Sequence, residues 1–303
     1  MFVFTPLFTI FILLLGGYVA KLVGALKQRQ SRAFLDFTII FAIPCLIFDG
    51  IYHLELSASF IILIFIGFFS CIVSGILATL LGYFLKFSKA TLLSIFLLAS
   101  FGNTLFIGIP IVSGIFSDFL IGKLILYDAF ATGIPMLVLS PFIVGLNSTQ
   151  KINFSQIFKK LVTFPPLIAI ALGFLCKLVA LPEFIFAPIK IFGSTATPVA
   201  LFAIGLGLGL NAIRSSYKSA SIVIFAKTLL APFIFIGILK ALNLEFSQDA
   251  IAAILESAMP TMTLVGAVIM KAKLDSNLAV SSIAFGILFS FISVPLLCAI
   301  LLT

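Results

Sequence analysis

One short stretch decides the fold: Ala99-Ser100-Phe101-Gly102-Asn103-Thr104-Leu105-Phe106-Ile107-Gly108-Ile109-Pro110. It lies within a long apolar segment, yet it contains glycine, asparagine, threonine and proline. A helix that crosses lipid must satisfy its backbone polar groups internally, and proline and glycine interrupt that pattern. Irregular backbone is tolerated at membrane depth only where protein buries it or where it lines a cavity. The stretch therefore predicts a break in a membrane-spanning helix.

A second stretch has the same character: Glu256-Ser257-Ala258-Met259-Pro260-Thr261-Met262-Thr263. Its proline, Pro260, follows Pro110 by 150 residues (260 minus 110). Two interrupted hydrophobic segments at corresponding positions of two halves indicate the binding site of a secondary transporter. The two interrupted stretches therefore predict that the binding site of a transporter lies beside them.

The composition predicts an integral membrane protein in contact with the lipid bilayer. Hydrophobic residues make up 62% of the 303 residues and charged residues only 9%, whereas soluble domains carry about 25% charged residues. At about 20 residues per span, the chain accommodates about ten spanning helices and no sizeable soluble domain. Lys and Arg in cytoplasmic loops explain the formal charge of +8 better than binding to nucleic acid does.

The apolar segments predict an all-α protein with ten transmembrane helices, at residues 3–23, 34–50, 57–85, 91–116, 120–146, 161–181, 184–210, 219–242, 250–270 and 278–301. Thirteen of the 18 basic residues fall in alternate loops, which makes those loops cytoplasmic and places both termini outside. The other loops carry mostly acidic residues. These basic residues are Lys21, Lys27, Arg29, Arg32, Lys86, Lys89, Lys151, Lys159, Lys160, Arg214, Lys218, Lys271 and Lys273.

The two halves of the chain, residues 1–147 and 148–303, are predicted to form an inverted repeat. Five spans in each half give the halves opposite orientations in the membrane. Pro44-Cys45-Leu46-Ile47-Phe48 matches Pro198-Val199-Ala200-Leu201-Phe202 at an offset of 154 (198 minus 44), close to the 150 that separates the two break prolines. A 5+5 repeat with paired broken helices places the binding site near the bilayer midplane, where the repeats meet.

The run from Gly102 to Pro110 closely resembles the Gly-Asn-Thr…Gly-x-Pro signature of the auxin efflux carrier family. That family includes the plant PIN-type auxin exporters and many bacterial organic-anion carriers. Thr197-Pro198-Val199-Ala200-Leu201-Phe202-Ala203-Ile204-Gly205 and Ser257-Ala258-Met259-Pro260-Thr261 also fit. Length, span number and outward termini extend the resemblance over the whole chain. The long cytoplasmic loop of many plant members is absent, which favours a short bacterial carrier in the inner membrane.

The resemblance implies a scaffold domain and a transport domain, in which the fourth and ninth helices cross at Pro110 and Pro260. It also implies secondary, elevator-type transport of a small organic anion and a homodimer formed through the scaffold domain. The anion would be a dicarboxylate such as malonate or malate, or an auxin-like acid. Glu256 followed by Ser-Ala-Met is similar to the crossover of the bile acid:sodium symporters, where an acidic residue helps to bind Na⁺. The coupling ion, H⁺ or Na⁺, stays open.

Glu256 and Asp128 are the candidate ion-coupling residues. A carboxylate at the bilayer centre costs at least about 2.5 kcal/mol, so its presence there indicates a function. Glu256 would bind Na⁺ with freed carbonyls and the Ser257 hydroxyl, or would take up a proton; a structural pair with Lys227 is the alternative. Asp128 would titrate or complete an ion site with Asn103 and Thr132, unless it merely pairs with Lys123.

The candidate substrate contacts lie at the two breaks. Asn103 would bind a substrate carboxylate or cap the half-helix that follows it, and the exposed N–H groups of such a half-helix favour anions. Lys227 is a candidate charge partner for the anion or for a carboxylate, with snorkelling to the membrane surface as the alternative. The full set of candidate substrate contacts is Asn103, Thr104, Gly108, Pro110, Pro260, Thr261 and Thr263.

Other classes of protein fit the sequence less well. An intramembrane enzyme would need a nucleophile–base set or a metal cluster at membrane depth, and no His/Cys/Asp grouping or zinc spacing is present, so no catalytic residue and no cofactor other than Na⁺ is expected. The single histidine, His53, is expected to be incidental. A sodium-coupled symporter of the bile-acid type for a larger anion, and an anion channel, remain as alternatives.

Overall fold

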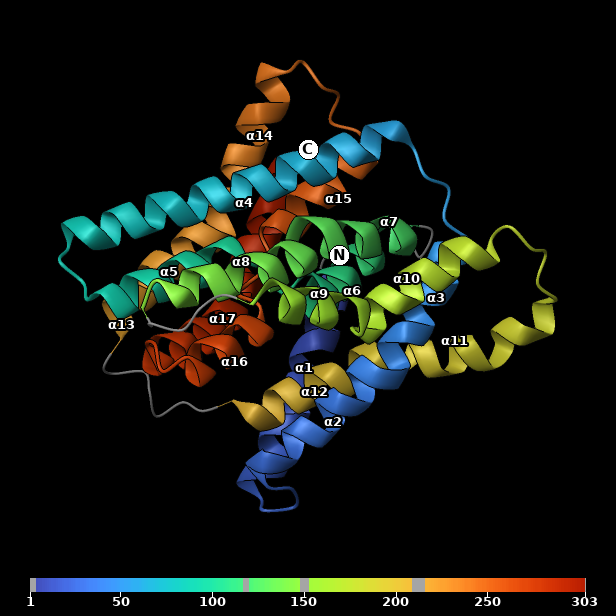
Figure 1. Cartoon of the computed structure of the whole chain (residues 1–303), viewed down its shortest axis with the longest axis horizontal. Coiled ribbons are helices and arrows are strands. Elements are labelled where there is room, and N and C mark those ends of the chain that lie inside the picture. The colour runs from blue at the N-terminus through green and yellow to red at the C-terminus, as the bar shows by residue number, and fades with distance from the viewer. Residues whose placement is uncertain (1–3, 117–119, 148–152, 209–215, 303) are drawn as a thin grey trace. The chain divides into compact units, whose positions relative to one another are not determined.

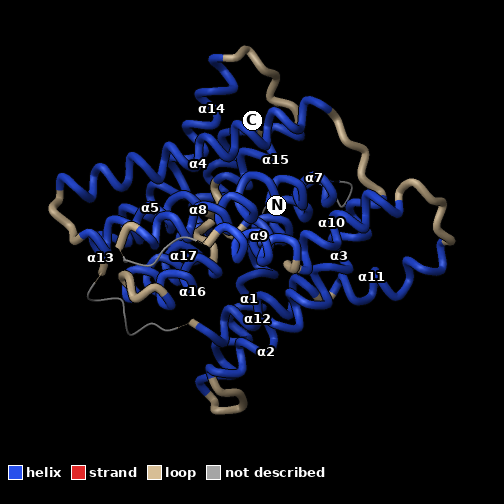
Figure 2. The backbone as a smooth tube through the Cα atoms, in the orientation of Figure 1, coloured by secondary structure: helices blue, strands red, loops and turns tan. Residues whose placement is uncertain are grey.

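The computed structural model describes residues 4–116, 120–147, 153–208 and 216–302 (Figure 1). These residues form helices joined by short loops, and Figure 2 shows no strand among them. Three residues of the loop-charge pattern, Asp118, Lys151 and Arg214, lie outside the described residues.

Seven helices among the described residues are long and apolar enough to span a membrane: residues 4–22, 28–52, 58–84, 121–145, 183–207, 217–241 and 276–301. An eighth candidate consists of α9 (Phe154–Val162) and α10 (Pro165–Cys176), which are bent by 56°. The chain is therefore an integral membrane protein with several apolar spans. The two other predicted spans are divided into pieces of 8 to 12 residues, which are too short to cross singly. The total of ten therefore stays a prediction.

The chain forms two compact units, and each takes residues from both predicted halves. The first unit contains Met1–Ser57, Leu105–Leu126 and Phe158–Leu208. Its elements include α1 (Phe4–Leu22), η1 (Gln28–Gln30), α2 (Ser31–Phe37), η2 (Thr38–Ala42), α3 (Ile43–Tyr52), α6 (Ile109–Phe116), most of α7 (Ile121–Tyr127), α10, η6 (Glu183–Ile185), α11 (Phe186–Ser194) and α12 (Ala196–Gly207).

Within the first unit, α1 and α12 lie side by side and touch through their backbones (Figure 1). A side chain on Gly17 would start 2.0 Å from the carbonyl oxygen of Phe202, and one on Gly205 would start 2.0 Å from that of Leu14. Any residue larger than glycine at either position would force the helices apart. Small residues permit this kind of close helix packing in membranes, where dispersion forces rather than the hydrophobic effect hold helices together.

The second unit contains Ala58–Thr104, Tyr127–Ile157 and Gly209–Thr303. Buried apolar side chains from its helices form one core, which includes Leu97, Met136, Val223, Val265 and Leu278. Its elements are α4 (Ala58–Phe84), α5 (Lys89–Ser100), η5 (Asp128–Gly133), α8 (Ile134–Gly145), α13 (Tyr217–Phe225), η8 (Ala226–Leu230), α14 (Ala231–Ala241), α15 (Gln248–Ser257), α16 (Thr263–Lys271) and α17 (Ser276–Leu301).

Short π-helices precede four of the prolines. They are η2 before Pro44, η3 (Thr104–Gly108) before Pro110, η5 before Pro135 and η8 before Pro232. Proline lacks an N–H group and its ring collides with the preceding turn, so the chain widens locally and neighbouring hydroxyl groups bind displaced carbonyls. The Thr132 hydroxyl donates to the carbonyl of Asp128 (2.7 Å), and the Ser74 hydroxyl donates to that of Ala226 (2.6 Å).

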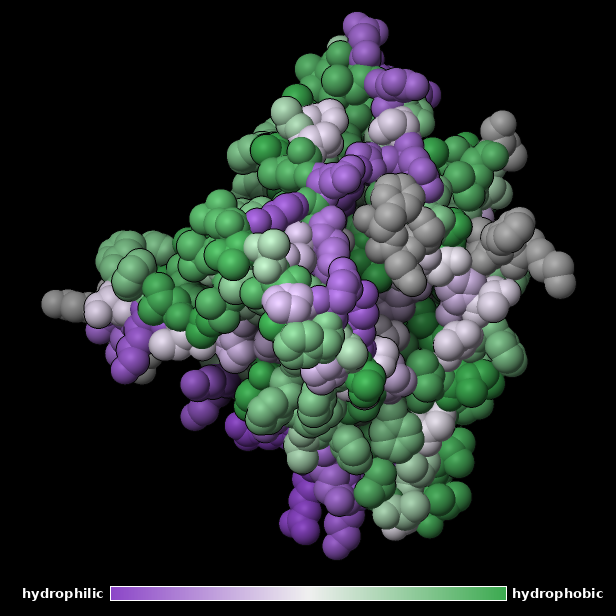
Figure 3. Space-filling model, turned by 90° about the vertical axis from the view of Figure 1, so that its right-hand side faces the viewer, coloured by the Kyte–Doolittle hydropathy of each residue, from purple (hydrophilic) through white to green (hydrophobic). Residues whose placement is uncertain are grey.

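The surface is apolar over much of its extent, as expected for contact with lipid. Figure 3 shows hydrophobic residues over much of the face in view, with hydrophilic residues gathered in patches. Large apolar side chains on the helices are exposed, among them Phe8 at 65%, Phe65 at 67% and Phe225 at 58%. Such exposure is costly in water but not in a bilayer, which explains why so many phenylalanines are exposed.

Candidate functional site

The structure interrupts the helix at both predicted stretches, and within the second unit the two interruptions meet. The backbone N–H of Asn103 donates to the carbonyl of Pro260 (2.7 Å), and the N–H of Met262 donates to the carbonyl of Phe101 (3.0 Å). Gly102 and Thr261 form an antiparallel bridge between them. The two extended segments thus satisfy each other's backbone groups, as membrane depth requires.

The first interruption does not lie at Pro110, where the crossing was expected. Residues 101–103 are the extended ones, seven residues earlier (110 minus 103). Pro110 is the second residue of α6, which continues directly from η3, and the wider π turn of η3 accommodates its ring and its missing N–H group. Gly108 ends η3, and both residues belong to the first unit. Pro260 does lie in the extended segment.

Lys227 lies at this crossing and is completely buried. Its ammonium group donates a hydrogen bond to the backbone carbonyl of Ser257 and lies 3.4 Å from the sulfur of Cys71. The carbonyl oxygen belongs to the last residue of α15. The lysine therefore does not snorkel to the membrane surface, and it binds a carbonyl at the end of a half-helix.

Glu256 is also completely buried, one residue before Ser257. Neither of its carboxyl oxygens has a hydrogen-bond partner among the described residues, so the predicted structural pair with Lys227 is not formed as a hydrogen bond. Asp128 and Lys227 lie close enough to act on Glu256 electrostatically, and so does Tyr127. A buried carboxyl group without partners must be neutral or meet a cation to be stable.

Asp128 has a different environment, although it lies in the same unit. Its carboxylate accepts a hydrogen bond from the Thr104 hydroxyl (2.5 Å). The Thr132 hydroxyl, which donates to the Asp128 carbonyl (2.7 Å), lies 3.3 Å from the same carboxylate oxygen. The two hydroxyls are 2.9 Å apart. The grouping of Asp128 with Thr132 matches the sequence interpretation, and Thr104 belongs to it as well.

The remaining predicted residues have mixed positions. Asn103 and Thr261 are each only 1% exposed. The Thr261 hydroxyl donates to the carbonyl of Leu98 (3.0 Å), so its proton is used to hold the end of α5. Thr263 is half-buried and begins α16, whose preceding residue, Met262, provides no side-chain cap. The first N–H groups of α16 thus have no capping side chain at Met262 and are suited to an anion.

Sequence reasoning missed several residues of this cluster. Cys71 and Ser74 come from α4, and Tyr127 is completely buried with its hydroxyl unpartnered among the described residues. A side chain on Gly67 would start 2.2 Å from that hydroxyl, so glycine makes room for the tyrosine. Polar residues inside the most apolar span are the signal that would have pointed to α4.

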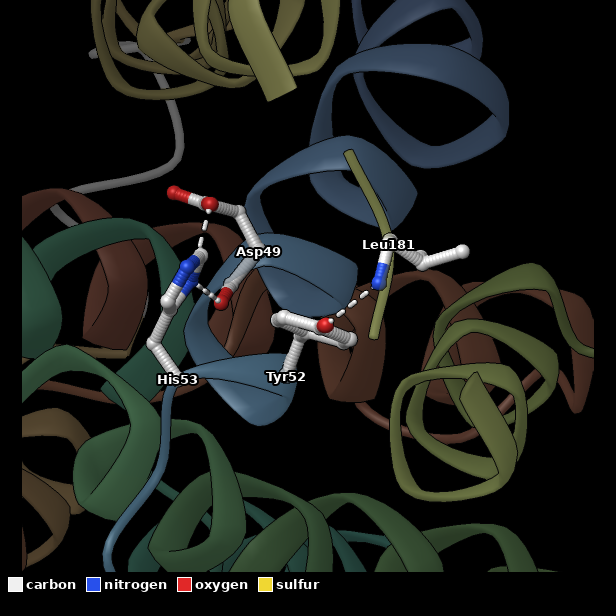
Figure 4. Close-up of polar contacts among 4 residues, drawn as sticks. All are labelled: Asp49, Tyr52, His53 and Leu181. Atoms are coloured by element: carbon white, nitrogen blue, oxygen red, sulfur yellow. Dashed lines mark hydrogen bonds and ion pairs between the residues drawn. The ribbon is translucent and has the colours of Figure 1, made fainter. Parts of the chain in front are cut away.

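A separate polar cluster closes α3 in the first unit (Figure 4). Nδ1 of His53 lies 2.9 Å from the backbone oxygen of Asp49 and 3.2 Å from its carboxylate. The hydroxyl of Tyr52 accepts the N–H of Leu181 (3.0 Å) and donates to the carbonyl of Val179 (3.2 Å). His53 therefore helps to end the helix, a structural role that fits the expectation of an incidental histidine.

Beside His53, the first unit has a cavity of about 970 Å³. Acidic and basic side chains both line it, from α3, the loop after it, α7 and α11. The ionisable lining residues are Asp49, His53, Glu55, Lys123 and Lys190. Its charges are mixed, and it holds none of the residues that the sequence singled out as substrate contacts.

The residues at the crossing fit a bound Na⁺ only in part. Glu256 offers two carboxyl oxygens without partners, which suits a cation. The Ser257 carbonyl, however, already faces the ammonium group of Lys227, and the Ser257 hydroxyl donates to Ile254 (2.6 Å). Among the described residues, no group of three or more His, Cys, Asp or Glu side chains is arranged to hold a metal ion.

Comparisons with known proteins agree with this architecture. Residues 2–298 match the Mem_trans family, described as membrane transport protein. An uncharacterized transporter of Methanothermobacter thermautotrophicus is 30% identical over 299 residues, and one of Methanocaldococcus jannaschii is 29% identical over 301 residues. Each alignment covers 95% of both chains. The resemblance found in the sequence is thus confirmed, and the chain belongs to the Mem_trans family of membrane transporters, the family of the auxin efflux carriers.

Proposed function

We propose that this transporter moves a small organic anion by secondary active transport, coupled to H⁺ or Na⁺, through an elevator-type movement. The observation that carries the proposal is the antiparallel contact between residues 101–103 and 260–262. Two broken helices that meet at membrane depth, with buried charges beside them, are the usual site of substrate and coupling ion in secondary transporters. The substrate would be a dicarboxylate such as malonate or malate, or an auxin-like acid.

An anion suits this site because it has hydrogen-bond donors and a buried lysine. The start of α16 presents backbone N–H groups, and the amide of Asn103 adds hydrogen-bond donors. Lys227 supplies a positive charge in a buried place, where water does not screen it and its attraction for an anion is strong. Thr104, Thr261 and Thr263 are the further proposed contacts, with Pro260 shaping the backbone. Gly108, at the end of η3, and Pro110, in α6, stay predicted contacts, and both belong to the first unit.

Glu256 and Asp128 are proposed to couple the movement to an ion. A carboxyl group that is buried without partners is costly when charged, so Glu256 would release or bind its cation only as its surroundings change. Asp128, with Thr132, would provide a second carboxyl group for the ion, and hydroxyl groups hold it in place. Ser257 would contribute its carbonyl.

The division into two units supports the elevator part of the proposal. The first unit takes most of the first two predicted spans of each half, and the second takes most of the last three. This is the partition expected for a scaffold and a transport domain built from inverted repeats. We propose ten spans, both termini outside a prokaryotic plasma membrane, and a homodimer formed through the first unit.

Two other functions are outcomes of the same test. A sodium-coupled symporter of the bile-acid type would transport a larger anion and require Na⁺. An anion channel would conduct at rates far above the turnover of a carrier. The buried, hydrogen-bonded crossing favours a carrier, because a channel needs a continuous water-filled path.

The test is uptake of labelled malonate, malate and an indole acid into proteoliposomes, under Na⁺ and pH gradients imposed separately. Saturable uptake that one gradient drives would support the proposal. Glu256→Gln is expected to lose gradient-driven uptake, whereas Glu183→Gln, the same change at an exposed glutamate in η6, should transport normally. Normal coupled uptake by Glu256→Gln would refute the role of that residue. Absence of uptake for all three acids would refute the substrate class.

A further inference from the structure

The hydrogen-bond partners of Lys227 are not explained by a role in binding an anion. Its ammonium group is completely buried, yet its described hydrogen bonds go to a backbone carbonyl and a sulfur atom, not to a carboxylate. Burial of a charged lysine is expensive, and such side chains are normally paired. Glu256 acts on the lysine only from a distance, without a hydrogen bond, so the groups in direct contact with the ammonium must include a source of negative potential in the backbone.

The end of α15 supplies that potential. Ser257 is the last residue of the helix, and the last carbonyls of a helix carry partial negative charge. In secondary transporters, the carbonyls at the ends of half-helices are the groups that coordinate a coupling Na⁺. The ammonium group of Lys227 occupies the position at which such an ion would bind the Ser257 carbonyl.

The surroundings of the lysine are built to hold it there. η8 widens the helix at Lys227, and the Ser74 hydroxyl binds the carbonyl of the preceding residue, Ala226. Gly102 leaves space for the lysine: a side chain there would start 2.7 Å from Cε and 3.1 Å from Nζ. Elements from three parts of the sequence thus fix one ammonium group at the crossing.

We propose that the ammonium group of Lys227 takes the place of a coupling Na⁺ at the end of α15, so that this transporter needs no Na⁺ and is coupled to H⁺ through Glu256. The charged and titratable groups that act on Glu256 are Asp128, Lys227 and Tyr127. The part of the inference that concerns coupling rests on the proposed transport function, but the part that concerns cation binding does not.

The experiment measures the thermal unfolding midpoint of the purified full chain in detergent, in NaCl and in choline chloride at equal ionic strength. The wild-type midpoint is expected to be the same in both salts. Lys227→Ser removes the ammonium group from the Ser257 carbonyl and adds a hydroxyl group that can bind Na⁺. The unfolding midpoint of this variant should therefore be several degrees higher in NaCl than in choline chloride, because a bound ion stabilises the folded state. Lys240→Ser, at an exposed lysine near the end of α14, should respond like the wild type.

Two results would overturn the inference: a wild-type chain that NaCl stabilises, or a folded Lys227→Ser chain that does not respond to NaCl. If Lys227→Ser does not fold, the inference is tested by measuring the binding of radioactive Na⁺ to the wild-type protein. No saturable binding supports the inference, and saturable binding overturns it. Neither measurement uses transport, so failure of the uptake assay would refute the proposed substrate class and leave the cation result standing.

Discussion

The two carboxyl groups near the crossing differ in how the protein holds them. Asp128 accepts a hydrogen bond from the Thr104 hydroxyl and lies beside that of Thr132, whereas Glu256, which is buried more completely, accepts none from the described residues. The first carboxyl group is held in place by hydroxyl groups, and the second is not. A buried acid with hydrogen-bond partners is fixed in one position, whereas one without them is available to bind a proton or a cation during a transport cycle.

The difference does not follow from the internal repeat. At offsets of 150 to 154, Lys227 corresponds to residues 73–77 and Asp128 to residues 278–282, and neither range contains a charged residue. Glu256 corresponds to residues 102–106, which are also uncharged. Each charged residue is therefore present in one half only. If the halves do descend from a duplication, the backbone crossing is the shared feature and the charges are specific to each half.

Asp128→Ala should have the largest effect on stability, because it removes the acceptor of the buried Thr104 hydroxyl and leaves a cavity beside the Thr132 hydroxyl. The loss should be about 3 kcal/mol, since hydrogen bonds to charged groups contribute about 1.5–3 kcal/mol. Unfolding of the purified protein in detergent measures it, with Asp36→Ala, an exposed aspartate 3.9 Å from Arg32, as the control. A loss no larger than that of the control would mean that the threonines do not stabilise Asp128.

Gly102→Ala should destabilise by about 2 kcal/mol, the cost of forcing a methyl group into a packed interior. The new Cβ would lie 2.7 Å from Cε of Lys227 and 3.0 Å from the carbonyl oxygen of Met259. Gly237→Ala is the matched control, because nothing lies within 4 Å of its Cβ position in α14. That control should gain about 0.5–1 kcal/mol from higher helix propensity. Equal effects of the two changes would show that the crossing is loosely packed.

Thr104→Val should cost about 1.5 kcal/mol, the lower end of the range for a hydrogen bond to a charged group, because the Thr132 hydroxyl stays beside the carboxylate. The same unfolding assay measures the effect. In an Asp128→Ala background the valine should cost less than it does alone, since the carboxylate it would have bound is gone. Additive losses would refute a shared hydrogen-bond network.

Glu256→Gln should have the smallest effect, within about 0.5 kcal/mol of wild-type stability, because no hydrogen bond of the carboxyl group is lost. The unfolding midpoint and gradient-driven uptake are measured on the same preparation. Stability should persist while coupled uptake disappears, the reverse of a structural residue. A loss above about 1 kcal/mol would place Glu256 in the same structural class as Asp128.

The sequence predicted the features that depend on single residue types. Glycine and proline at both breaks predicted the interruptions, and Glu256, Asp128 and Lys227 within apolar segments predicted buried charge. Which group each side chain contacts was not predictable. Lys227 donates to the Ser257 carbonyl, and η8, in which it lies, packs against α4. Contacts of this kind depend on tertiary packing, which residue types alone do not specify.

The sequence also did not predict helix α9, since its first seven residues fall in the basic loop before the span predicted at residues 161–181. Apolar residues recur at helical spacing in this segment, and two lysines lie among them. The apolar residues are Phe154, Ile157, Phe158 and Leu161, and the lysines are Lys159 and Lys160. That pattern is typical of a helix lying at a membrane surface. A search for short amphipathic segments beside the spans would have found it.

The four π-helices also bear on how this chain could have arisen. A π turn holds one residue more than an α turn, so each is equivalent to the insertion of a single codon into a helix. Such an insertion rotates everything beyond it by about 100°. In η8, one inserted residue would be enough to turn a lysine from the lipid toward the protein interior. A new charge could thus be brought into the membrane interior by a single insertion, without a new helix.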